Sequence, residues 1–140
     1  MNANQETLWL TGGCSCGAVH FEARSAPTFV CICHCNSCRK ATGGAMVPWA
    51  TFKASDVHFT EGHLQERWSS PGVTRGHCAR CGTSLSYRHE RRPGEIDLTI
   101  ESMDKPRSFR PTAHIWVEDK LPWIVIGDDL PQYPQTASGA

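Results

Sequence analysis

Short stretches in which apolar and polar residues alternate recur along the chain, and they predict β-strands. The clearest is residues 18–24, where Val19, Phe21 and Ala23 would share one face of an extended segment. Most of the connections between such stretches are short and rich in Gly, Pro, Ser or Asp, which is typical of turns. The other predicted strands are residues 28–33, 46–52, 57–60, 64–69, 83–88 and 96–100. The pattern therefore indicates a mainly β protein.

Helical periodicity is nearly absent. One short helix is predicted from about residue 37 to residue 42, where Gly43 and Gly44 would end it. The 140 residues contain no internal repeat and no linker. We therefore predict a single domain over residues 7–134, with loose termini at residues 1–6 and 135–140.

The charge balance excludes some partners. Fourteen basic and fourteen acidic residues give a net charge of zero, so no nucleic-acid partner is predicted. No membrane association is predicted either, because no apolar run approaches the roughly 18 residues of a membrane span. The start, MNANQETLWL, lacks the features of a signal peptide. We therefore expect a cytoplasmic location, where thiols stay reduced and dense cysteine indicates metal binding more often than disulfides.

Eight cysteines fall into three groups along the chain. The groups are Cys14-x-Cys16, Cys31-x-Cys33-x-Cys35-x-x-Cys38 and Cys78-x-x-Cys81. The last is followed by Gly82, and glycine permits the tight turn that points both sulfurs of a zinc knuckle at one ion. A redox motif would instead expect a thioredoxin-like βαβ pattern, which the sequence lacks. Because a structural zinc takes four ligands, two more must come from elsewhere in the chain.

The order of these motifs resembles that of the glutathione-dependent formaldehyde-activating enzyme family, which shares its domain with centromere protein V. Later segments are similar to the family pattern as well, and the resemblance spans roughly residues 10–134. The motifs that carry it are Gly12-Gly13-Cys14-Ser15-Cys16-Gly17, Cys33-His34-Cys35-Asn36-Ser37-Cys38-Arg39, Cys78-Ala79-Arg80-Cys81-Gly82, Ser102-Met103-Asp104-Lys105-Pro106, His114-Ile115-Trp116, and Pro122-Trp123 followed by Asp128-Asp129-Leu130-Pro131.

This resemblance implies a β-tent fold: small stacked antiparallel sheets held by zinc, with at most one or two short helices. It also implies two Zn²⁺ sites. The first would be a structural zinc on Cys14, Cys16, Cys78 and Cys81. The second would lie on Cys33, Cys35 and Cys38, with a fourth position left to water or substrate, which is the general arrangement of a catalytic zinc.

The activity implied is that of a carbon–sulfur lyase, which joins glutathione to formaldehyde as S-(hydroxymethyl)glutathione. The partner would be a small thiol such as glutathione, and the catalytic residues would be Cys33, Cys35, Cys38 and Arg39. Arg39 would offset the negative charge of the sulfurs or bind a substrate carboxylate. The alternative is a non-catalytic zinc-binding module that binds a protein and has two structural zinc sites.

Cys31 decides between these functions, and the sequence leaves its role open. It would be a buried apolar residue, a fourth ligand that closes the second site, or a redox partner of Cys33. On an ideal strand Cys31 and Cys35 would lie roughly 13 Å apart, too far to share an ion unless the chain bends. His34 and His77, each next to a cysteine, are predicted to pack or to form hydrogen bonds rather than to bind metal.

Overall fold

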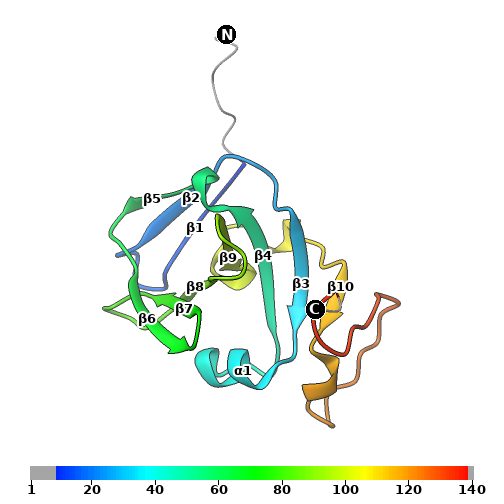
Figure 1. The fold of residues 1–140 in the computed structure, drawn as a ribbon. Coiled ribbons are helices and arrows are strands. Elements are labelled where there is room, and N and C mark those ends of the chain that lie inside the picture. The colour runs from blue at the N-terminus through cyan, green and yellow to red at the C-terminus, as the bar shows by residue number, and fades with distance from the viewer. Residues whose placement is uncertain (1–8, 139–140) are drawn as a thin grey trace.

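Two β-sheets stack around a core in the computed structural model, which describes residues 9–138, and a helix lies at one end of the longer sheet (Figure 1). The helix α1 is Asn36–Thr42, and four 3₁₀ turns lie at Ala54–Asp56, Ile100–Ser102, Pro106–Ser108 and Val117–Asp119. The strands are β1 (Leu10–Gly13), β2 (His20–Ala23), β3 (Phe29–Cys33), β4 (Val47–Lys53), β5 (Val57–Glu61), β6 (Gln65–Ser70), β7 (Val73–His77), β8 (Ser84–His89), β9 (Glu95–Thr99) and β10 (Ala113–Ile115).

The smaller sheet has the order β1-β2-β5, and the larger has the order β10-β3-β4-β9-β8-β7-β6. All pairs are antiparallel except β10 and β3, which run parallel at the edge of the larger sheet. The mainly β fold of stacked sheets is therefore confirmed, with a departure from the expected antiparallel arrangement at this edge, where an isolated bridge between His114 and Gln132 is parallel as well.

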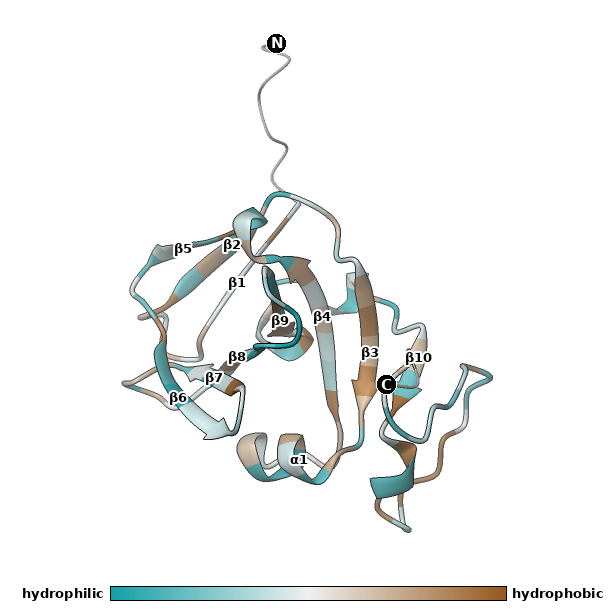
Figure 2. Ribbon diagram, in the orientation of Figure 1, coloured by the Kyte–Doolittle hydropathy of each residue, from teal (hydrophilic) through white to brown (hydrophobic). Residues whose placement is uncertain are grey.

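The first core lies between the two sheets. Val19, Phe21 and Ala23, the predicted inner face of residues 18–24, are 3%, 1% and 0% exposed. They pack on apolar residues of the larger sheet, including Ala50 and Phe52, and Figure 2 shows the apolar stretches of β3, β4 and β9. We call the following residues the first core: Val19, Phe21, Ala23, Val30, Ala50, Phe52, Cys78, Leu85, Ile96, Leu98, Ile100 and Met103.

A second core covers the opposite face of the larger sheet, and it consists of Cys31, Cys33, Cys38, Val47 and Trp49. The strand β3 contributes to both cores, because Val30 points to the first and its neighbours point to the second. Burial on both faces explains the nearly continuous apolar sequence of residues 28–33.

All seven predicted strands are present, and three more occur that the pattern did not predict. The missed strands β1, β7 and β10 are only four, five and three residues long. In β7 the alternation is hidden because Arg75 occupies a buried position. The predicted end of the helix is confirmed, since Gly43 caps α1 in the left-handed conformation at φ 79°.

The predicted single domain and loose termini stay predictions. Residues 1–6 of the expected loose N-terminus lie outside the described residues, as do residues 139 and 140. Within the remaining tail the Gln135 carbonyl accepts a hydrogen bond from the Trp116 amide at 2.9 Å. None of the helices described is long and apolar enough to cross a membrane.

Close packing at Gly12 of β1 yields a prediction for stability. A methyl group there would lie 2.8 Å from the Ser102 carbonyl oxygen and would collide with the Phe21 ring. We expect Gly12→Ala to lower the free energy of unfolding by about 1–3 kcal/mol, as overpacking does. The control is Gly127→Ala, whose methyl group would meet nothing within 4 Å. Equal stability of the two variants in chemical denaturation would contradict the packing argument.

Candidate functional site

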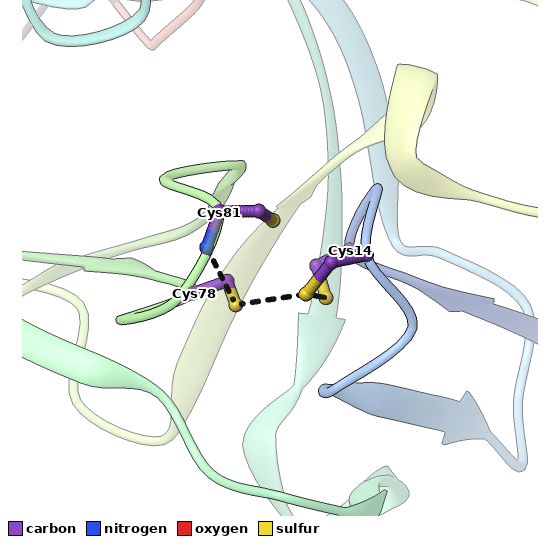
Figure 3. A group of neighbouring side chains, drawn as sticks. Cys14, Cys78 and Cys81 are labelled. Carbon is purple, nitrogen blue, oxygen red and sulfur yellow. Dashed lines mark hydrogen bonds between the residues drawn. The ribbon is translucent and has the colours of Figure 1, made fainter.

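Four sulfurs from two distant parts of the chain meet beside the first core. The sulfurs of Cys14, Cys16, Cys78 and Cys81 all lie within 4.8 Å of one another. Cys14 and Cys16 belong to the turn between β1 and β2, and Cys78 and Cys81 to the turn after β7 (Figure 3). The distance from Cys14 Sγ to Cys16 Sγ is 3.6 Å, and that from Cys16 Sγ to Cys78 Sγ is 3.8 Å.

These separations fit a metal ion and do not fit disulfides. A disulfide would place two sulfurs about 2.05 Å apart. Four sulfurs at Zn–S distances of about 2.3 Å in a tetrahedron lie about 3.8 Å from one another. All eight cysteines are free thiols. The four-sulfur group therefore has the donor set and spacing of a structural zinc site, and it can bind a metal ion.

The turn after β7 has the conformation of a zinc knuckle. The backbone amides of Arg80 and Cys81 both point at Cys78 Sγ, at 3.4 Å, and Gly82 adopts a φ of +81°. Hydrogen bonds from the hydroxyl and amide of Thr83 lower the pKa of Cys81 to about 5. Amide and hydroxyl donors of this kind favour thiolates, the form in which cysteine binds metal.

A separate three-sulfur group lies where β3 meets α1. The sulfurs of Cys33, Cys35 and Cys38 lie within 4.8 Å of one another. Cys35 is the N-cap of α1, and its sulfur accepts a hydrogen bond from the Cys38 amide at 3.2 Å. The helix start therefore brings two of the three sulfurs together, while Cys33 comes from the last position of β3.

Cys31 does not belong to this group. It lies inside β3, with Ala113 on one side and Trp49 on the other, and is 4% exposed. Burial, with nearby negative charges, raises the pKa of its thiol to about 12. The geometry accordingly favours the buried apolar role among the three that the sequence left open.

The positive charge next to the three sulfurs is Arg75 of β7. Its two terminal nitrogens lie 3.6 and 3.7 Å from Cys38 Sγ, and the residue is 6% exposed. The guanidinium also donates to Ser69 Oγ at 3.2 Å and stacks over the ring of Tyr87, 4.9 Å from its centroid. A buried guanidinium requires a negative partner, and no carboxylate pairs with it among the residues described.

The surroundings of Cys38 favour its thiolate form. Hydrogen bonds from the thiols of Cys33 and Cys35 lower the pKa of Cys38 to about 2, and Arg75 adds to this shift against the opposing effect of burial. Hydrogen bonds with Cys35 and Cys38, together with burial, raise the pKa of Cys33. Without metal, the group would thus contain one thiolate and hold it beside Arg75.

Arg39, the basic residue expected next to the sulfurs, has other partners. Its guanidinium donates to the carbonyl oxygens of His34 and Asp119 and to the side chain of Asn36. Arg39 thereby connects the start of α1 to the 3₁₀ turn at Val117–Asp119. It also lines a cavity of about 420 Å³ together with Lys40 and Trp123.

The comparison with protein families agrees with the cysteine arrangement. The family model described as "Glutathione-dependent formaldehyde-activating enzyme" matches residues 9–119. The chain belongs to this family. Its matched region includes all eight cysteines, so both sulfur groups lie within the family domain.

A solved structure shares the fold. It is a crystal structure of a Rhodobacter sphaeroides protein from structural genomics, 19% identical to this chain. The alignment covers 89% of this chain and 99% of that protein, with a TM-score of 0.57. At this identity the similarity extends to the architecture only.

His34, which lies between Cys33 and Cys35 in the sequence, faces away from their sulfurs. His34 Nε2 lies 2.9 Å from His114 Nδ1, and His114 Nε2 lies 2.9 Å from Asp128 Oδ2. Because a carboxylate only accepts, His114 donates to Asp128 through Nε2, and in the neutral imidazole its Nδ1 then accepts from His34 Nε2. The hydrogen-bonding role predicted for His34 is confirmed, and His77 lies outside both sulfur groups.

This chain of hydrogen bonds ties the C-terminal segment to β3. His34 and His114 are 0% and 3% exposed, and burial with the neighbouring positive charges lowers the pKa of His34. The hydrogen bond from His114 and the amide of Leu130 lower the pKa of Asp128. Neutral His34 and ionised Asp128 are therefore the forms that the fold favours.

Exchange of one ligand in each sulfur group should separate their roles. We expect Cys81→Ser to unfold the chain, because structural zinc contributes about 10–16 kcal/mol and a domain of this size is stable by only about 5–15 kcal/mol. We expect Cys35→Ser to stay folded and to bind one zinc instead of two. Circular dichroism and native mass spectrometry measure both properties. Equal loss of structure in the two variants would contradict the assignment.

The Asp128–His114 bond should make stability depend on pH. A folded-state pKa below the unfolded value adds stability above the unfolded pKa of about 3.9, and this stability disappears as pH falls through the folded pKa. We expect Asp128→Ala to be less stable than wild type at pH 6, with a difference that shrinks below about pH 4. The control is Asp129→Ala, an exposed neighbour. A difference that does not change with pH would contradict this role.

Proposed function

We propose that this chain is a zinc-dependent carbon–sulfur lyase that acts on thiol–aldehyde adducts. The family reaction would be the addition of glutathione to formaldehyde, which gives S-(hydroxymethyl)glutathione, and the reverse cleavage. The observation that carries the proposal is the three-sulfur group, from which Cys31 is excluded by its place inside β3. A closed site would need a fourth protein ligand, and three sulfurs alone would leave one position for a substrate.

Both metal ions would be held by cysteines alone. Cys14, Cys16, Cys78 and Cys81 would hold the structural zinc, and Cys33, Cys35 and Cys38 the second zinc. A zinc ion at the second site would bind the incoming thiol and favour its thiolate, which is the nucleophile. Eight free thiols fit a reducing compartment, and we infer a cytoplasmic location on that ground.

The addition of a thiol to formaldehyde needs no further reagent. The thiolate sulfur forms a bond to the carbonyl carbon of formaldehyde, and the oxygen takes up a proton from solvent. In the reverse direction the carbon–sulfur bond breaks and the thiolate leaves. No electrons are gained or lost, so the site needs no redox partner.

Two arginines would support this step from different sides. Arg75 would offset the one net negative charge that three thiolates and Zn²⁺ would have, since its guanidinium lies against Cys38 Sγ. Arg39 would act as a positioning residue, because it fixes the carbonyl of His34 between two of the sulfur-bearing residues. Its further partner, the carbonyl of Asp119, holds the neighbouring turn in place.

A non-catalytic protein-binding module is the second candidate. Trp123 and Val125 are 68% and 88% exposed, and large apolar side chains at such positions are common in protein-binding surfaces. In that case both zinc ions would be structural, and thiols would not bind.

The test measures metal content, thiol binding and rate on the same samples. Native mass spectrometry is expected to find two zinc ions per chain and retained glutathione. Exchange NMR is expected to detect faster interconversion of formaldehyde and S-(hydroxymethyl)glutathione than the uncatalysed reaction. Cys35→Ser should lose the acceleration while staying folded, and Lys40→Gln, at an exposed position of α1, should keep it. An unchanged rate in Cys35→Ser, or none above background in wild type, would overturn the proposal.

A further inference from the structure

A cavity of about 220 Å³ lies next to the three-sulfur group. It opens between the C-terminal turn of α1 and the strands β6, β7 and β8. Its connection to the sulfurs is Arg75, which lines the cavity and also contacts Cys38 Sγ at 3.6 Å. The lining residues are Ala41, Thr42, Trp49, Arg67, Arg75, Gly76, His77, Gly82, Ser84 and Ser86.

The lining has basic groups and no acidic one. Arg67, Arg75 and His77 all contribute to it, whereas none of its residues is Asp or Glu. Arg67 and Arg75 face each other as partners across β6 and β7, so their side chains share one face of the sheet. No salt bridge to a carboxylate involves either arginine within residues 9–138. Arg75 is already paired with Cys38, so Arg67 supplies the uncompensated positive charge of this face, which can attract an anion to the cavity.

The donors of Arg75 are only partly used. A guanidinium has five N–H groups. One of them bonds Ser69 Oγ, and each terminal nitrogen directs one at Cys38 Sγ. The remaining two N–H groups, one on each terminal nitrogen, point to opposite sides of the planar guanidinium, so one of them can donate to a carboxylate oxygen in the cavity. Arg67 is exposed at the same cavity, where it can attract an anion from solvent.

We propose that this cavity binds a carboxylate of the thiol substrate while the substrate's sulfur reaches the three-sulfur group. The inference rests on the proposed function and adds the feature by which the site would select its thiol. A pocket for a drug-sized ligand measures about 300–1,000 Å³, so a 220 Å³ cavity takes one end of a tripeptide and not all of it. Thiols that carry a carboxylate are therefore favoured over neutral thiols.

The probe for this cavity is S-methylglutathione, which has both carboxylates and no free thiol. Its binding to the zinc-loaded chain is measured by NMR titration, with the diethyl ester of the same compound, which lacks both carboxylates and keeps the ammonium group, as the comparison. We expect the ester to bind at least about tenfold more weakly, since a charge-assisted hydrogen bond contributes about 1.5–3 kcal/mol in favourable geometry. We expect the largest amide shifts near Thr42, Arg75 and Ser84.

The decisive variant is Arg67→Gln, because Arg67 is exposed and its exchange leaves the fold intact. We expect it to weaken S-methylglutathione binding about tenfold, with little effect on the ester. The matched control is Arg88→Gln, an exposed arginine of β8 that does not line the cavity. Equal affinity in the two variants, or equal binding of acid and ester by wild type, would overturn the carboxylate site.

This design separates the cavity from the proposed reaction. S-methylglutathione cannot form the carbon–sulfur bond, so its binding tests the anion site whatever the activity. Arg67-dependent binding in a chain that does not accelerate the formaldehyde reaction would refute the lyase proposal and support the carboxylate site. If Arg67→Gln and wild type accelerate the reaction equally and binding does not depend on Arg67, the lyase proposal is supported and the carboxylate site is refuted.

Discussion

The four-sulfur group is the constraint on which the rest of the fold depends. It joins Cys16 to Cys78, 62 positions apart in the sequence, and so it connects the turn of the small sheet to the end of β7. A metal ion that closes so long a loop strongly restricts the unfolded chain. Cys78 itself belongs to the first core, so a residue that can bind metal also fills the space between the sheets.

The larger sheet separates two environments, and the sulfur groups are divided between them. The four-sulfur group borders the first core, whereas Cys33 and Cys38 are members of the second. A substitution in one sulfur group can therefore leave the other group unchanged. The four-sulfur group would stabilise the stack of sheets, and the three-sulfur group lies at the end of β3 on the far face. Because β3 and β4 are buried on both faces, even a protein of this size can keep the two sulfur groups in separate cores.

The negative charge of the three-sulfur group is balanced by Arg75, a residue of β7, which comes much later in the sequence. Arg75 contacts Cys38 from 37 positions away, and the aromatic face of Tyr87 lies against its guanidinium. Burial of an arginine is costly unless an anion is close, and a thiolate cluster is such an anion. The same arginine lines the basic cavity, so in our proposal one side chain would link metal binding to recognition of an acidic substrate.

The sequence by itself determined the fold class, and its resemblance to the family supplied both sets of candidate metal ligands. Alternation at Val19, Phe21 and Ala23 predicted a strand, and the spacing of Cys78, Cys81 and Gly82 predicted a knuckle, because these features depend on neighbours only a few positions away. Tertiary structure decided what distant residues do to one another. Cys31 lies inside β3, and Arg75 is the arginine that contacts Cys38 Sγ. His34 is hydrogen-bonded to His114, which is bonded in turn to Asp128. No local pattern contains this information, because a buried arginine looks polar in the sequence and its partner is known only when the strands are paired.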